Sequence, residues 1–196
     1  MQKEASKVLQ LVKEAVSGDV DFWLTRAAEG TLSGLGVRRG QTVLDFGSGP
    51  GYYAVPAARI VGRSGRVFAV ETNPVAVLRA RWRTMRADLP NVAVLGSRGI
   101  TGLPLGDDSV DLTLAFDVLL PYYFSDPEIS QVLGEISRVS RPEAVLAVYP
   151  SHVPAERLLP LIVAAGFQLG ARMRTRLLHD GRLMRDEVLV FGKTPS

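Results

Sequence analysis

The residues best suited to chemistry form a glycine-rich run at positions 43–53, VLDFGSGPGYY. An apolar segment followed by closely spaced glycines is typical of a buried strand, a tight turn and the start of a helix. A helix that begins after such a turn presents unpaired backbone N–H groups, and the glycines let a ligand approach the backbone closely. The run therefore predicts a ligand-binding turn.

Two details distinguish this turn from one that binds a dinucleotide. The dinucleotide fingerprint is G-x-G-x-x-G, and Tyr52 stands where its last glycine is expected, one position after Gly51. Asp45, two residues before Gly47, places a negative charge beside the turn, which suits a cationic ligand better than a pyrophosphate. This combination resembles motif I of the class I S-adenosylmethionine-dependent methyltransferases.

The rest of the chain alternates predicted strands and helices. We expect strands at 41–46, 66–71, 91–96, 111–118, 144–149, 167–177 and 187–193. Helices are expected at 3–17, around 22–24, and at 51–60, 74–85, 126–139 and 154–165. The order predicts an α/β fold, a doubly wound, mostly parallel seven-stranded sheet with a C-terminal antiparallel hairpin and helices on both faces. It resembles the Rossmann-like class I methyltransferase fold over about residues 37–193.

Two units follow from this pattern. We expect residues 1–36 to form an N-terminal helical extension that packs on the domain, and residues 37–196 to form the methyltransferase domain. In the related enzymes an extension before the first strand often covers the site, so the region of Trp23 is expected either to cap a pocket or to pack on the sheet.

The resemblance implies which residues of the glycine turn hold S-adenosylmethionine, with S-adenosylhomocysteine as the product. The backbone of Gly47, Ser48, Gly49 and Gly51 would approach the methionine moiety and the sugar. Asp45 would bind the ammonium group directly or through water.

A second set of candidates follows the second predicted strand. Glu71 ends that strand, and a carboxylate there can accept both hydroxyls of a ribose. It matches the acidic residue of the family's second motif. Thr72 and Asn73 are expected to flank the ribose or the adenine, and Asn73 before Pro74 is explained equally well as a helix cap.

The loop after the third strand departs from the family pattern. Many members carry an acidic residue near Ser97 or Arg98 that accepts from the adenine amine, and none is present here. Ser97 and the backbone of Arg98 or Gly99 are the remaining candidates. Arg98 would either stack on the adenine or point into solvent.

The segment after the fourth strand is expected to line both cofactor and acceptor. Phe116 and Asp117 are the candidates there, and Tyr122 would wall the acceptor pocket or simply pack. His152 follows the fifth strand and is the best candidate for a general base, with exposure to solvent as the plain alternative. His179 falls in a predicted turn and is not expected to take part, and we expect no metal ion.

The chemistry of the donor limits what the protein must supply. A sulfonium methyl group is already activated, so proximity, alignment and desolvation can suffice for an in-line displacement. The N/D-P-P-Y/F motif of enzymes that methylate adenine or glutamine amines is absent after the fourth strand, and no cysteine is present for arsenic chemistry. We therefore expect a small-molecule acceptor. The alternatives are a non-catalytic S-adenosylmethionine-binding module, an RNA or protein methyltransferase, and a nucleotide-dependent oxidoreductase.

Composition sets the outer limits. The 196 residues suffice for one α/β domain, and the net charge of +3 is weak evidence for nucleic-acid binding. The absence of cysteine excludes disulfides and thiolate metal sites, and with no recognisable signal peptide it favours the cytoplasm. No apolar run is long enough to span a bilayer, so no membrane partner is expected. The oligomeric state stays open.

Overall fold

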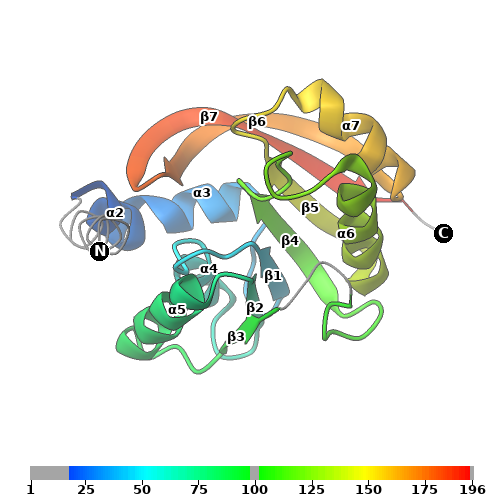
Figure 1. Ribbon diagram of the computed structural model, residues 1–196. Coiled ribbons are helices and arrows are strands. Elements are labelled where there is room, and N and C mark those ends of the chain that lie inside the picture. Colours follow the sequence, from blue (N-terminus) through cyan, green and yellow to red (C-terminus); the bar gives the residue numbers. More distant parts are fainter. Residues whose placement is uncertain (1–17, 98–101, 195–196) are drawn as a thin grey trace, which may run out of the picture.

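The computed structural model describes residues 18–97 and 102–194, so the helix expected at 3–17 lies outside the described residues. A seven-stranded sheet forms the centre of the molecule, with the order β3-β2-β1-β4-β5-β7-β6 (Figure 1). The strands are β1 (Thr42–Phe46), β2 (Arg66–Glu71), β3 (Val92–Gly96), β4 (Val110–Phe116), β5 (Ser140–Tyr149), β6 (Phe167–His179) and β7 (Arg182–Lys193). The predicted fold class is confirmed.

The direction of each strand decides which loops meet. The first five strands pair in parallel, and β7 is antiparallel to both β5 and β6. β6 therefore runs in the same direction as the first five strands. As a result the C-terminal ends of β1, β2, β4, β5 and β6 lie at one edge of the sheet, where ligands bind in open α/β folds.

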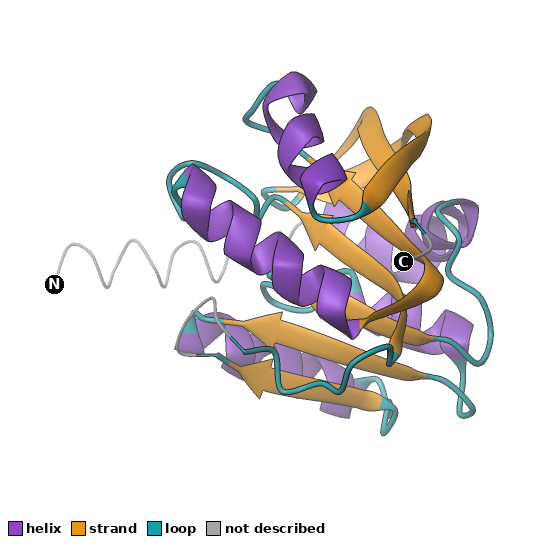
Figure 2. Cartoon of the chain, turned by 90° about the vertical axis from the view of Figure 1, so that its right-hand side faces the viewer, coloured by secondary structure: helices purple, strands orange, loops and turns teal. Residues whose placement is uncertain are grey.

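Helices cover both faces of the sheet (Figure 2). They are α2 (Gly18–Phe22), the π-helix η1 (Trp23–Ala27), α3 (Ala28–Gly34), α4 (Ala54–Val61), α5 (Pro74–Arg86), α6 (Asp126–Val139) and α7 (Ala155–Ala164). The longest of them, α6, has 14 residues, and no helix in the described parts of the chain is long and apolar enough to cross a membrane.

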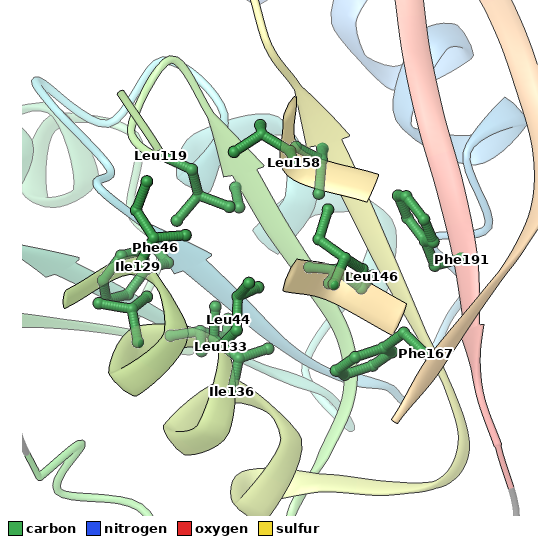
Figure 3. Close-up of a cluster of buried hydrophobic side chains, with 14 of the residues drawn as sticks. Leu44, Phe46, Leu119, Ile129, Leu133, Ile136, Leu146, Leu158, Phe167 and Phe191 are labelled. Atoms are coloured by element: carbon green, nitrogen blue, oxygen red, sulfur yellow. The ribbon is translucent and has the colours of Figure 1, made fainter. Parts of the chain in front are cut away.

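Two apolar layers hold these helices in place. The apolar stripes of α6 and α7 pack on one face of the sheet, and α3 and α4 pack on the other. Burying such apolar stripes is the main source of stability for the fold. The first layer contains Leu44, Phe46, Leu119, Ile129, Leu133, Ile136, Leu146, Leu158, Phe167 and Phe191 (Figure 3).

Local sequence signals set the starts of two helices next to the sheet edge. The Asn73 side chain accepts from the backbone N–H groups of Val75 at 2.9 Å and Ala76 at 3.3 Å, with Pro74 at the first helical position. At α6, the Ser125 backbone N–H donates to Glu128 at 2.7 Å, which forms a capping box. The predicted cap at Asn73 is confirmed.

Some predicted boundaries were wrong, chiefly in the C-terminal hairpin. β6 continues to His179 and β7 begins at Arg182, so the turn consists of Asp180 and Gly181, both with positive φ. Two positive-φ residues are the geometry that a tight hairpin favours. β5 also begins earlier than expected, at Ser140, and β4 ends at Phe116.

The helix predicted from the spacing of apolar residues at 75–85 is present as α5. Its regularly spaced residues Val75, Leu78, Trp82 and Met85 face solvent, however, with 44–71% of each exposed. The residues that α5 buries are Val77, Ala80 and Thr84. Periodicity identified the helix but not the face that packs.

Candidate functional site

The glycine-rich turn joins β1 to α4. Its three glycines share positive φ angles, but the space around Gly47 and Gly49 differs. Gly47, Gly49 and Gly51 have φ angles of 74°, 51° and 82°, a region that side chains disfavour. A Cβ atom at Gly47 would come within 2.5 Å of Val118, whereas one at Gly49 would meet nothing within 4 Å. Gly47 is therefore needed for packing, and Gly49 borders open space that a ligand can enter.

Two buried polar groups lie beside this turn. Asp45 is 2% exposed and Ser48 is 5% exposed. Within residues 18–97 and 102–194, neither Oδ2 of Asp45 nor Oγ of Ser48 has a hydrogen-bond partner. Buried polar atoms without partners are uncommon and call for an explanation, such as a missing ligand.

The environment of Asp45 perturbs its carboxyl group. Burial, followed by the nearby charge of Glu71, raises the pKa of Asp45 to about 7, and a hydrogen bond from the backbone of Ala54 acts in the opposite direction. A cationic group placed next to Asp45 would favour its charged form. The site thus suits a ligand that brings a positive charge to the turn.

Glu71, at the end of β2, connects the turn to the next loop. Its Oε2 accepts from the backbone N–H of Gly49 at 2.8 Å, and its Oε1 accepts from those of Thr72 at 2.7 Å and Asn73 at 2.8 Å. A carboxylate has about four acceptor positions. The Thr72 hydroxyl also lies 3.4 Å from Oε1, so Oε2, with one partner, is the oxygen that can still accept a hydroxyl group from a ligand.

The other residues expected around the adenine are only partly described. The backbone N–H of Ser97 donates to the carbonyl oxygen of Glu71 at 2.9 Å, which keeps the start of this loop at the same sheet edge. Arg98 and Gly99 lie outside the described residues.

Trp23 of η1 packs against the end of the glycine turn, at Tyr52 and Tyr53. Its ring is fully buried, its Nε1 donates to the carbonyl oxygen of Tyr52 at 2.9 Å, and it packs against Tyr53 with ring centres 5.2 Å apart. The Tyr53 hydroxyl in turn exchanges hydrogen bonds of 3.0 Å with the backbone of Leu178. The N-terminal helices thus contact both the turn and β6.

Phe116, at the end of β4, lies inside this aromatic cluster. It is 6% exposed, and its ring meets those of Tyr53 and Tyr149 at 4.8 Å and 6.3 Å. Little of its side chain is left for a ligand.

Asp117, the next residue, lies within a cluster of polar side chains. Its backbone is left-handed, with φ of 55°, a strained conformation for a residue other than glycine. Oδ1 accepts from the Ser151 hydroxyl, and Oδ2 lies 2.6 Å from Nδ1 of His179. His152 is exposed, and its ring centre lies 4.9 Å from that of His179 and 6.1 Å from that of Tyr122.

The structure thus brings the candidates Asp117, Tyr122 and His152 close together, and the placement of His179 in a turn was wrong. His179 is the last residue of β6 and not part of the turn, and its side chain lies beside Asp117. The sequence did hold a usable signal. A strand joined by a hairpin to an antiparallel last strand runs parallel to the others, so its C-terminal residue reaches the ligand-binding edge.

Comparisons with known proteins agree with this geometry. Residues 43–143 match the family model described as "Methyltransferase domain". The chain is similar to the arsenite methyltransferase of Halobacterium salinarum, with 36% identity over 56% of this chain and 27% of that protein. It is also similar to the ubiquinone/menaquinone biosynthesis C-methyltransferase UbiE of Klebsiella pneumoniae, with 33% identity over 77% of this chain and 59% of that enzyme.

A solved structure matches over nearly its whole length. The SAM-dependent methyltransferase of Aquifex aeolicus superposes with a TM-score of 0.72 and 26% identity, covering 95% of this chain and 98% of that one. The chain spans only about a third of the first curated relatives and about three fifths of the UbiE enzymes.

Proposed function

This chain belongs to the methyltransferase-domain family, and from that premise we propose that it binds S-adenosylmethionine and transfers the methyl group to a small-molecule acceptor. The observation that carries the proposal is that buried polar atoms without hydrogen-bond partners lie next to open space at the glycine turn. There Asp45 and Ser48 keep buried oxygens without partners while Gly49 borders open space.

The residues present fit the chemical groups of this cofactor. Asp45 would pair with the ammonium group, and the backbone of the turn at Gly47, Ser48, Gly49 and Gly51 would contact the methionine moiety. The burial of Asp45 and Ser48 and the positive φ angles of the three glycines support this assignment. Contacts to Asp45 Oδ2 and Ser48 Oγ would satisfy buried oxygens that have no partner among the described residues. The backbone N–H groups of the turn already donate within the protein, so there the glycines would serve close approach of the ligand.

The loops after β2 and β3 would hold the nucleoside. Glu71 was expected to accept from both ribose hydroxyls, but its backbone hydrogen bonds leave room mainly at Oε2, so it would accept from one of them. Thr72 would flank the ribose, and Asn73 also caps α5. Ser97, Arg98 and Gly99 stay our candidates for the adenine.

The acceptor would bind beside the loops that follow β4 and β5. When bound, S-adenosylmethionine supplies an activated methyl group, so the chain's main task is to align the acceptor for in-line displacement. Asp117, Tyr122 and His152 would orient it, because they lie together beyond the ends of these strands. Their polar tips suit an acceptor that offers oxygen or nitrogen atoms.

Two considerations favour a small acceptor over a macromolecule. The net charge of +3 gives no strong electrostatic attraction for RNA. The UbiE relatives, whose name refers to quinone synthesis, match about three quarters of this chain. The protein-L-isoaspartate O-methyltransferases match only about a third of it. A cytoplasmic location and the division into an extension, 1–36, and a methyltransferase domain, 37–196, stay our predictions.

Calorimetric titration with S-adenosylhomocysteine tests the cofactor assignment, with NADH as the control ligand. We expect micromolar binding of S-adenosylhomocysteine only. Binding of NADH alone would return the chain to the oxidoreductase alternative, and binding of neither would refute the proposal.

A non-catalytic binding module is the second candidate, and the missing acidic residue near Ser97 favours it. Cofactor binding is expected of both a binding module and an enzyme, so only a turnover assay distinguishes them. Transfer of label from S-adenosylmethionine to any small acceptor would exclude the module. A folded, cofactor-binding protein that transfers no label across a broad panel of hydroxyl, amine and enol acceptors would favour it.

A further inference from the structure

The polar cluster beside the proposed acceptor position has the composition of a metal site. It contains one carboxylate, Asp117, and two imidazoles, His152 and His179, contributed from the ends of β4, β5 and β6. One ligand atom from each residue lies within 4.8 Å of the other two. We propose that these three side chains bind one divalent transition-metal ion, with Zn²⁺ as the reference ion.

The donor set agrees with the coordination chemistry of such ions. Two imidazole nitrogens and one carboxylate oxygen are the protein ligands of many catalytic zinc sites, and the same set suits Fe²⁺. Protein ligands at about 2.0–2.2 Å from a tetrahedral ion stand roughly 3.4 Å apart. The atoms here are close enough to reach that spacing by side-chain rotation, and the hydrogen bond between Asp117 and His179 would then be replaced by the ion.

Neighbouring groups hold the ligands in the required orientation. The Ser151 hydroxyl donates to Oδ1 of Asp117, which leaves Oδ2 directed at the imidazoles. Oδ2 of Asp180 lies 3.6 Å from Nε2 of His179. A histidine that binds a metal through one nitrogen commonly directs its other N–H to a carboxylate. The 3.6 Å separation is longer than a hydrogen bond, so Asp180 would have to move closer to Nε2 to act as a positioning residue for Nδ1 of His179.

The placement of the histidines points to a built site rather than a chance grouping. The sequence contains only two histidines, 27 positions apart, and the fold places both in this cluster.

The inference deepens the proposed function, on which it rests for its role. Three protein ligands would leave at least one coordination position open. Tyr122, which would line the acceptor position, lies near the cluster, with its ring centre 6.1 Å from that of His152. An ion there would select an acceptor that offers an oxygen donor, such as a hydroxyl or an enol. It would also favour the deprotonated form of that donor, so no general base would be required.

Metal binding can be tested without cofactor or acceptor. The full chain, free of any histidine tag, is stripped with a chelator and titrated with Zn²⁺ by calorimetry, and with Co²⁺ by visible absorption. We expect one ion per chain, a Co²⁺ spectrum of low coordination number, and shifts of both imidazole signals in NMR spectra. With only two histidines, each signal can be assigned from a single substitution.

Substitutions identify the ligands. His152→Gln, His179→Gln and Asp117→Asn should each weaken Zn²⁺ binding by at least about 100-fold, and Asp180→Asn by about 10-fold. Asp88→Asn is the matched control, because Asp88 also has a positive φ, of 50°, but is exposed beyond α5. Circular dichroism and S-adenosylhomocysteine binding in the presence of chelator show whether each variant is folded.

The outcomes separate the two proposals. If the unmodified chain binds no Zn²⁺ at one ion per chain, or if binding is unchanged in both histidine variants, the metal site is overturned even if the cofactor binds normally. Failure to bind S-adenosylhomocysteine, with an intact one-to-one metal site, would instead overturn the proposed function.

Discussion

Asp45 offers a quantitative test, because its burial couples the stability of the fold to pH. The side chain is 2% exposed, its Oδ2 has no partner among the described residues, and burial together with the charge of Glu71 raises its pKa to about 7. In an unfolded chain the same group would titrate at 3.8. Replacing it by asparagine keeps the shape of the side chain and removes the ionisation.

The sign of the effect follows from proton binding. Between pH 3.8 and about 7 the folded protein keeps a proton on Asp45 that the unfolded chain has already released. The contribution to the free energy of unfolding is therefore fully present below pH 3.8, falls as the pH rises, and is lost above about pH 7. The pKa difference is about three units, and each unit corresponds to about 1.4 kcal/mol, so the whole change is about 4 kcal/mol.

The assay is urea unfolding of the ligand-free protein at pH 5 and pH 7.5, followed by circular dichroism. Relative to Asp45→Asn, the free energy of unfolding of the unmodified protein should fall by about 2–3 kcal/mol over this interval. Using the difference between the two proteins cancels the titration of groups that they share. Asp88→Asn, an exposed aspartate, should show no such difference.

One result would refute the reasoning about Asp45. If the unmodified protein and Asp45→Asn change in parallel within about 0.5 kcal/mol between the two pH values, Asp45 is ionised in the folded protein throughout. The carboxylate would then have a partner that stabilises its charge without a ligand.

Three further predictions concern the same edge of the sheet. Glu71→Ala should weaken S-adenosylhomocysteine binding by about 1–3 kcal/mol, or roughly 5- to 150-fold, and an unchanged dissociation constant in calorimetry would show that Glu71 does not hold the ribose. Gly49→Val should abolish binding, since its side chain would enter the open space beside the turn, and it should also lower stability, since valine is strained at a φ of 51°. Near-normal binding by a variant that circular dichroism shows to be folded would move the site elsewhere. Trp23→Phe removes the hydrogen bond to the Tyr52 carbonyl and should lower the free energy of unfolding by about 1–3 kcal/mol; equal urea midpoints would exclude a supporting role.

Some features of the site depended on residues that are close in sequence. The turn after β1 requires positive φ angles and close approach, which only its glycines allow, so VLDFGSGPG marked it directly. The cap at Asn73–Pro74 is equally local, and Glu71 was recognised because a strand end was evident. Alternating predicted strands and helices, followed by two strands joined by a turn, were sufficient for the sheet.

Burial was harder to predict because it depends on neighbours from distant segments. The apolar stripe of α5 identified a helix, but only the packed structure shows that Leu78 and Met85 face solvent while Ala80 meets the turn at Gly51. From its position before the first strand, Trp23 could either cap a pocket or pack on the sheet. In the structure its ring is held by a hydrogen bond to the Tyr52 carbonyl oxygen and by packing against Tyr53.

Short-range patterns of hydrophobicity and backbone freedom were enough to predict the family, the sheet and the glycine turn. Which polar side chains meet became visible only in the folded chain. His152 and Asp117 were recognised one at a time, and His179 was dismissed, because their proximity depends on the direction of β6 and on the length of its hairpin. Side chains that are 62 positions apart in the chain form one cluster only when the sheet brings their strand ends to the same edge.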